Sequence, residues 1–138
     1  MNRKSFFMAI VIALVVAGGT GFAQQQRRPY DQIMKDIGAT FGTLRKNLEA
    51  NNAAAAAEDA AKLEGFFAET EAFWVPFNTK DATGFAKRGR EAAAAIGTAA
   101  KGNDIKAAQA SVAVVQGTCA NCHRAHRQQT ASGYLIKP

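Results

Sequence analysis

The chain has 138 residues, a length that suits one compact domain, and 48% of them are hydrophobic. Its 17 basic side chains outnumber 11 acidic ones, for a net charge of +6. Because acidic residues lie between the scattered basic ones, the composition argues against a nucleic-acid binder.

Residues 1–23 have the pattern of a secretory signal peptide. Arg3 and Lys4 supply the positive start, residues 6–17 are apolar, and Gly21-Phe22-Ala23 forms a small-x-small cleavage site. The alternative is an uncleaved membrane anchor, but glycine and threonine interrupt the apolar run soon after residue 17. We therefore expect cleavage after Ala23 and export to the periplasm.

The expected mature chain is residues 24–138. Without Arg3 and Lys4 it carries 15 basic and 11 acidic side chains, a net charge of +4. Its 115 residues have room for one domain and not for two. After cleavage we expect no stable association with a membrane.

Two helices are predicted in the first half of this domain, where apolar residues recur at spacings of three and four. The first begins at Pro29, which suits a first helical position, and ends at Asn51-Asn52. The second opens with the alanines of residues 53–57 and ends at Pro76. Their expected core stripes are Ile33, Ile37, Phe41, Leu44 and Leu48, followed by Leu63, Phe66, Phe67, Thr70, Phe73 and Trp74.

Two further helices are predicted in the second half. Thr79 or Asp81 is expected to cap the third, which stops near Gly102, and Asn103 is expected to cap the fourth. The third has a core face of little bulk, and the apolar stripe of the fourth leads into two cysteines. The stripes are Phe85, Ala92, Ile96 and Ala99, followed by Ile105, Ala108, Val112, Val115, Cys119 and Cys122.

No stretch alternates β-branched and polar residues, so we expect no β-sheet. The connections between the first and second helices, and between the third and fourth, are short, which favours antiparallel neighbours. The predicted fold is therefore all-α, an antiparallel up-down-up-down four-helix bundle.

Cys119, Cys122 and His123 form a C-x-x-C-H motif. Residues three and four apart lie on one side of a helix, so both thiols can reach the two vinyl groups along one edge of a porphyrin. Each thiol would form a thioether bond, and the His123 imidazole would bind the iron as its proximal ligand. The motif predicts one covalent haem c, held inside the bundle because the core stripe includes both cysteines.

Three other chemistries use cysteines at this spacing. A thioredoxin-like redox pair belongs at the start of a helix in a βαβ unit, which is not the pattern here. A zinc site of Cys119, Cys122, His123 and His126 would lack the usual second pair of ligands from a distant segment. A disulfide is disfavoured because cysteines one helical turn apart rarely reach its geometry.

An exported four-helix domain with C-x-x-C-H near its C-terminal end resembles the class II cytochromes c, the cytochrome c′ family. The resemblance covers residues 24–138. In the family an arginine follows the histidine of the motif by four positions, which here is Arg127, and an aromatic residue often precedes it where this chain has His126. Family members are often homodimers through their first two helices, so the resemblance implies a possible homodimer.

The resemblance also implies a distal residue on the first helix, eight positions before the glycine of an aromatic-Gly pair. Here the pair is Phe41-Gly42, and the distal residue is Met34. Members with an apolar residue there have five-coordinate, high-spin iron that admits nitric oxide or carbon monoxide, whereas the low-spin branch has a methionine bound to iron. This chain has the methionine of the low-spin branch.

The residues themselves point the same way. Met34 is the only methionine after residue 23, and it flanks the core stripe of the first helix. Thioether sulfur is a usual partner of histidine in electron-carrying haems, where it raises the reduction potential. The alternative is that Met34 only packs beside the haem.

Several neighbours of the motif have expected roles of their own. His126 lies three residues after His123 on the same helix, so it cannot easily reach the opposite face of the haem. We therefore expect it at the surface or near a haem propionate. Arg127 is expected to pair with a propionate, to shield the proximal pocket or to be solvated, and Lys35 is expected to face solvent. Tyr30 is expected at the haem edge or at the surface, and the aromatic residues of the second helix are expected to be core.

The expected function is that of a periplasmic single-electron carrier, with iron held by His123 and Met34. The alternative is a binder of nitric oxide or carbon monoxide in which Met34 stays off the iron. We expect no enzymatic activity, because the mature chain offers no distal histidine for peroxide chemistry. The expected partners are unidentified redox proteins.

Overall fold

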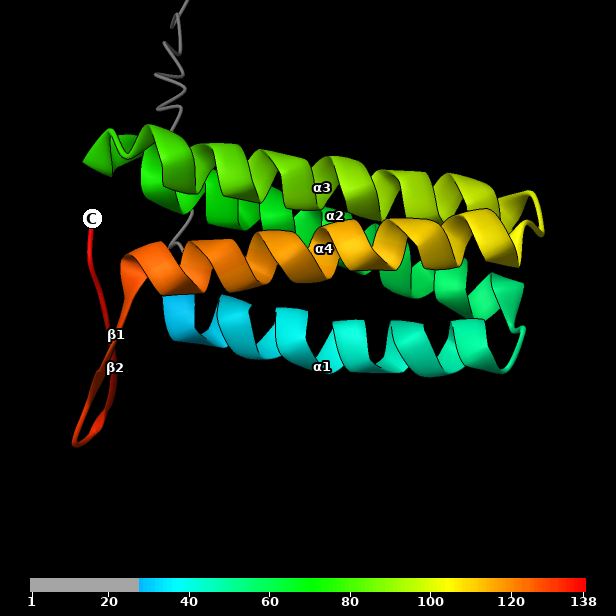
Figure 1. Cartoon of the computed structure of the whole chain (residues 1–138), viewed down its shortest axis with the longest axis horizontal. Helices are drawn as coiled ribbons and strands as arrows, with labels where there is room; N and C mark the ends of the chain where they lie inside the picture. The colour runs from blue at the N-terminus through cyan, green and yellow to red at the C-terminus, as the bar shows by residue number, and fades with distance from the viewer. Residues whose placement is uncertain (1–27) are drawn as a thin grey trace, which may run out of the picture.

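The structure, a computed structural model, describes residues 28–138, so the expected signal peptide at residues 1–23 lies outside the described residues. The described chain is mostly helical, as predicted, and contains four long helices lying alongside one another (Figure 1). No helix within residues 28–138 combines the length and hydropathy needed to cross a membrane. The elements are α1 (Tyr30–Glu49), α2 (Ala53–Trp74), the 3-10 helix η1 (Val75–Phe77), α3 (Lys80–Lys101), α4 (Ile105–His126), β1 (Arg127–Thr130) and β2 (Gly133–Ile136).

The helices are packed unevenly, because some contribute small side chains to the core and others contribute large ones. α2 packs most extensively against α3, through alanines and a glycine that let the two backbones approach closely. A Cβ atom added at Gly97 of α3 would lie 3.5 Å from the Cβ of Ala60 in α2. α1 and α4, in contrast, contact each other little. The fully buried large side chains are Leu44, Leu48, Leu63, Trp74, Ile96 and Val115.

Each connection between consecutive long helices contains an asparagine in the left-handed conformation. Asn51, Asn78 and Asn103 have φ values of 54°, 53° and 58°, and asparagine tolerates this left-handed conformation better than most residues. Asn52 then caps α2 by accepting a hydrogen bond from the Ala55 amide. The cap predicted for α4 at Asn103 is wrong, because Asn103 makes the turn and Asp104 accepts the hydrogen bond from the Ala107 amide.

The first and third helices also begin slightly differently from the prediction. Pro29 is the N-cap of α1, which starts at Tyr30, and Pro29 therefore lies just outside the helix. Thr79 is the N-cap of α3, but its side chain does not cap the helix by a hydrogen bond. Pro76 lies within η1, directly after the end of α2.

A C-terminal hairpin corrects the expectation that the chain has no β-structure. β1 pairs with β2 in antiparallel register, from Arg127 opposite Ile136 to Thr130 opposite Gly133. Gly133, with a φ of 140°, follows the two-residue turn. The strands have four residues each, too few for an alternating pattern to be recognised in the sequence.

Gly89 of α3 lies directly against the ring of Phe67 in α2. A Cβ atom at position 89 would lie 2.6 Å from Cε1 of that ring. Phe67 is only 4% exposed, so its ring has little room to move. The absence of a side chain at Gly89 is therefore what allows this aromatic residue to fill the core.

Replacing Gly89 with alanine should destabilise the fold by about 1–3 kcal/mol, the usual cost of overpacking a core, despite the better helix propensity of alanine. Chemical denaturation of the purified protein would measure this loss. The control is Gly65→Ala in α2, where an added Cβ meets nothing within 4 Å. It should stabilise the protein by up to about 1 kcal/mol, and equal stability of the two variants would contradict the prediction.

Candidate functional site

Two cavities lie between α1 and α4, where the helices are least closely packed. The larger has a volume of about 410 Å³ and extends to the C-terminal hairpin. The smaller, of about 190 Å³, extends into the core toward α2 and α3. Tyr30, Met34, Cys122 and His123 line both cavities. Three of the four predicted site residues, Met34, Cys122 and His123, therefore line both cavities. The fourth, Cys119, lines the smaller cavity.

The two thiols are half-buried on the inner side of α4. Both cysteines are free, and Cys119 packs against the hydrophobic core. Burial raises the pKa of the Cys119 thiol. Burial also raises the pKa of Cys122, to about 11, with smaller contributions from repulsion by Cys119 when that thiol is ionised and by the Asp81 carboxylate. Both thiols are therefore protonated at neutral pH, which is the opposite of what a reactive redox pair needs.

His123 is a neutral imidazole at neutral pH. Burial lowers the pKa of its ring, and the positive charge of Arg127 lowers it further. A neutral ring keeps a nitrogen lone pair, which is the form that binds a metal. The environment of His123 therefore suits a ligand to iron.

Met34 reaches the same space from the opposite helix. It lies in the second turn of α1, is partly buried and packs against the core. Tyr30 stands one turn before it on the same side of the helix. The indole nitrogen of Trp74 donates a hydrogen bond of 2.9 Å to the Tyr30 hydroxyl, and Phe73 stacks on the Tyr30 ring. These contacts fix the start of α1, and with it the position of Met34.

Burial is also the main cause of the high pKa of Tyr30, which rises to about 12 despite the hydrogen bond from Trp74. Tyr30 therefore stays protonated at neutral pH. Since its oxygen already accepts a hydrogen bond from Trp74, its own O–H proton is free to point elsewhere. Tyr30 is partly buried and lines both cavities.

His126 is buried, and the expectation of a surface position is wrong. One ring nitrogen lies 2.9 Å from the carbonyl oxygen of Lys137, and the other lies 3.0 Å from Oδ2 of Asp81. Both partners are acceptors, so both contacts are hydrogen bonds only when the ring carries two protons. Trp74 packs on the same ring, with 5.1 Å between centroids. His126 thus joins α4 to α3 and to the C-terminus.

The contact with His126 affects the pKa of the Asp81 carboxyl. Partial desolvation raises its pKa, but the hydrogen bond from His126, together with backbone hydrogen bonds and the attraction of the imidazole charge, lowers the pKa below its ordinary value overall. Asp81 is therefore ionised at neutral pH. A charged acceptor strengthens its hydrogen bond to His126.

Arg127 and Lys35 lie at the rim of the larger cavity. The guanidinium of Arg127 stacks on the ring of Tyr134, with 3.5 Å from its central carbon to the ring centroid. Lys35 is exposed, as expected, and forms an exposed ion pair of 2.9 Å with Asp31. Both cations stand where they can reach an anionic group bound in the cavity.

Sequence reasoning missed the residues of β2, because no β-structure was expected. Tyr134, Leu135 and Ile136 line the larger cavity. The signal available was a short aromatic and aliphatic run after Ser132-Gly133, a pair typical of turns. It also missed Trp74 as the hydrogen-bond partner of Tyr30.

A metal held by side chains alone is not supported. Among residues 28–138, no three His, Cys, Asp or Glu side chains gather to hold a metal ion. The proposed zinc alternative in particular would need His126, whose nitrogens face Asp81 and Lys137. The donor set does fit a haem, because two thiols and an imidazole from α4 share mostly apolar cavities with a thioether from α1.

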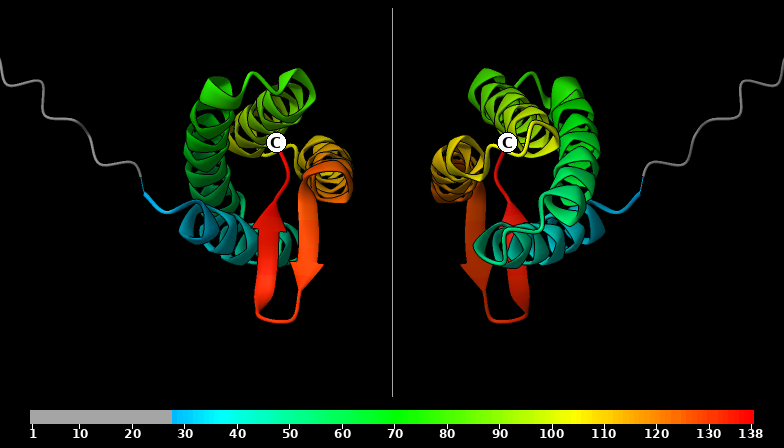
Figure 2. Two further views of the ribbon diagram at one scale, coloured as in Figure 1. Left: turned by 90° about the vertical axis from the view of Figure 1, so that its left-hand side faces the viewer. Right: turned by 90° about the vertical axis from the view of Figure 1, so that its right-hand side faces the viewer.

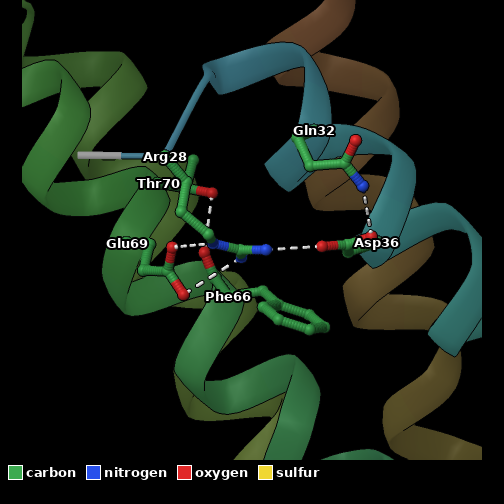
Figure 3. A network of polar contacts seen from close by, with 6 residues as sticks. All are labelled: Arg28, Gln32, Asp36, Phe66, Glu69 and Thr70. Carbon is green, nitrogen blue, oxygen red and sulfur yellow. Dashed lines mark hydrogen bonds and ion pairs between the residues drawn. The ribbon is translucent and has the colours of Figure 1, made fainter. Parts of the chain in front are cut away.

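An ion-pair network holds the N-terminal end of α1 against α2. Arg28 lies between two carboxylates, with Nη1 at 2.6 Å from Asp36 and Nε at 2.9 Å from Glu69 (Figure 3). Its guanidinium also lies over the Phe66 ring, 5.2 Å from the centroid. Gln32 donates a second hydrogen bond to Asp36. The network lies next to the turn that carries Tyr30 and Met34.

The hydrogen bonds of Asp36, first from Arg28 and then from Gln32, lower the pKa of its carboxyl. A carboxyl with a lowered folded pKa stabilises the fold above its unfolded pKa and loses that contribution as the pH falls through the folded value. Arg28→Ala should therefore lower the melting temperature at neutral pH and have a smaller effect in strong acid.

Thermal denaturation at both pH values checks this prediction. Arg45→Ala, which removes an exposed arginine from α1, is the control and should change the melting temperature little at either pH. A difference between wild type and Arg28→Ala that is as large in acid as at neutral pH would contradict the role of Asp36.

No family model, curated protein or solved structure matches this chain. The proposed function therefore depends on the motif, on the two cavities and on the side chains that line them.

Proposed function

We propose that the protein is a periplasmic c-type cytochrome similar to the class II cytochromes c, and that it carries single electrons. In this proposal Cys119 and Cys122 bind one haem c through thioethers, and His123 and Met34 bind its iron. The domain would be residues 24–138, an antiparallel up-down-up-down bundle, exported by the signal at residues 1–23. Its partners would be redox proteins, with a homodimer through the first two helices as the resemblance implies.

The observation that carries the proposal is the meeting of four donor groups at one pair of cavities. His123 and Cys122 on α4, and Met34 on α1, line both cavities, and Cys119 lines the smaller one. The larger cavity, even without the smaller one, has a volume within the range of small-molecule sites, about 300–1,000 Å³. Donors from one helix thus share a space with a donor from the facing helix.

A bound haem would supply the one-electron chemistry of its iron, between the ferrous and ferric states. The chain's own residues would bind, orient and shield it. Apolar side chains of α1 and α2, including Ile37, Phe41 and Phe67, line the smaller cavity and exclude water there. Burial keeps His123 neutral, so no proton has to leave when its nitrogen binds metal. Retaining the same two ligands through the redox cycle limits rearrangement.

The second candidate function is binding of nitric oxide or carbon monoxide by five-coordinate iron. The size of the larger cavity beside Met34 favours it, because the space lets a small ligand approach if the thioether stays off the iron. The two functions share the haem, the thioethers and His123. They differ only in whether Met34 is a ligand.

The visible spectrum of the ferric protein, made in a host that attaches c-type haem, tests both proposals. An electron carrier with His/Met ligation should give low-spin bands and weak absorption near the red edge from sulfur ligation. A high-spin spectrum that shifts readily under carbon monoxide would support gas binding instead. A colourless mature protein that folds equally well without haem would overturn both.

A further inference from the structure

The C-terminal hairpin has an apolar surface that the helices leave uncovered. Tyr134, Leu135 and Ile136 are 57%, 59% and 38% exposed, although all three line the larger cavity. Large apolar side chains that remain exposed beside a mostly apolar cavity indicate that something bound in the cavity covers them. The hairpin lies beyond one end of the helices (Figure 1), and in the end-on views it crosses α1 next to the end of α4 (Figure 2).

Hydrogen bonds tie the base of the hairpin to the helices. The Lys137 amide donates a hydrogen bond of 2.9 Å to the His126 carbonyl, and the Lys137 carbonyl lies 2.9 Å from the His126 ring. Asp81 holds that ring from α3, so the base is tied to two helices. An isolated two-stranded hairpin is at best marginally stable in water. Its outer part therefore needs a further contact to stay in place.

We propose that β2 forms one wall of the haem site, with the strand around Leu135 and Ile136 covering the bound macrocycle and limiting the access of water to it. This inference rests on the proposed function, because the macrocycle is the occupant that it requires. The cavity that these two residues line is the one shared by Cys122, His123 and Met34. Packing on the macrocycle would supply a further contact for the hairpin, and the hairpin would close the side of the site that the four helices leave open.

The test replaces the two side chains with serine, singly and together, in the haem-loaded protein. The control is Val114→Ser in α4, which is 51% exposed and lies on α4 outside both cavities. Hydrogen exchange of the Tyr134 to Ile136 amides measures how often the hairpin opens. The rate at which hydrogen peroxide bleaches the haem measures how accessible its edge is.

Leu135→Ser and Ile136→Ser should each speed the exchange of these amides by about tenfold, because less apolar contact holds the hairpin closed. Haem bleaching should be faster in the same variants, whereas Val114→Ser should match the wild type in both measurements. If the double variant does not fold, the single variants decide the outcome, since each changes one exposed side chain.

Wild-type rates in Leu135→Ser, Ile136→Ser and the double variant, with the haem still bound, would overturn the role of the hairpin and leave the proposed function intact. The exposed side chains would then be a surface for a partner protein. A wild-type protein that carries no haem would instead overturn the proposed function itself, so the two failures are distinguishable.

Discussion

Replacing Met34 with alanine should convert the ferric protein from low spin to high spin. If Met34 and His123 bind the iron as proposed, removing the thioether leaves His123 as the one protein ligand, and five-coordinate ferric haem is high spin. Because a methionine ligand raises the reduction potential, the potential should also fall. Visible spectroscopy and a redox titration check both effects.

Met34→Leu is the matched variant, because leucine keeps nearly the same volume and removes only the sulfur. If Met34 ligates iron, leucine should give the same high-spin spectrum as alanine. If Met34 only packs in the partly buried position at which it lies, leucine should leave the spectrum of the wild type unchanged. The second result would reject the ligand assignment and favour the gas-binding function.

Replacing both cysteines with serine should abolish covalent attachment of the haem. Serine cannot form the thioether, so acid-acetone extraction should remove all haem from Cys119→Ser/Cys122→Ser and none from the wild type. Each single variant should keep its haem through the remaining sulfur, and mass spectrometry should show one haem mass added to the chain. The double variant should also be the least stable, because the proposed haem would fill the cavities between α1 and α4.

Asn121→Ser is the control, since Asn121 lies between the two cysteines and is exposed. It should retain its haem through extraction. Wild-type protein whose haem washes out would contradict the thioethers, even if its spectrum shows that a haem is bound.

The helices could be predicted because local sequence signals mark their ends and their buried faces. The alanines from residue 53 begin α2, Pro76 falls just after its end, and Gly102 is the C-cap of α3. Apolar spacing identified the buried faces of α1 and α2, including Ile33, Leu44 and Leu63. The cap of α4 was misplaced by one residue because Asn103 and Asp104 are both good caps, and only the backbone turn at Asn103 decides between them.

The site was predictable only where its chemistry lies in a motif. The positions of Cys119, Cys122 and His123 on the inner side of α4 follow from helical spacing. The hydrogen bond between Trp74 and Tyr30 joins residues 44 positions apart, and that between His126 and Asp81 joins residues 45 apart. Such contacts depend on how the helices are packed, which spacing within one helix does not encode. The same is true of the cavity wall contributed by β2.

The uneven packing of the helices predicts the order in which they fold. α2 and α3 follow one another in the chain and are packed closely through small residues, so their contacts are local and should form early. α1 and α4 come from opposite ends of the domain and face each other mainly across cavities. If the last step of folding is the approach of α1 to α4, the thiols stay within reach of the attachment machinery until then. In the proposed cytochrome, the loose packing between these two helices would thus allow haem attachment before it provides space for the haem in the folded protein.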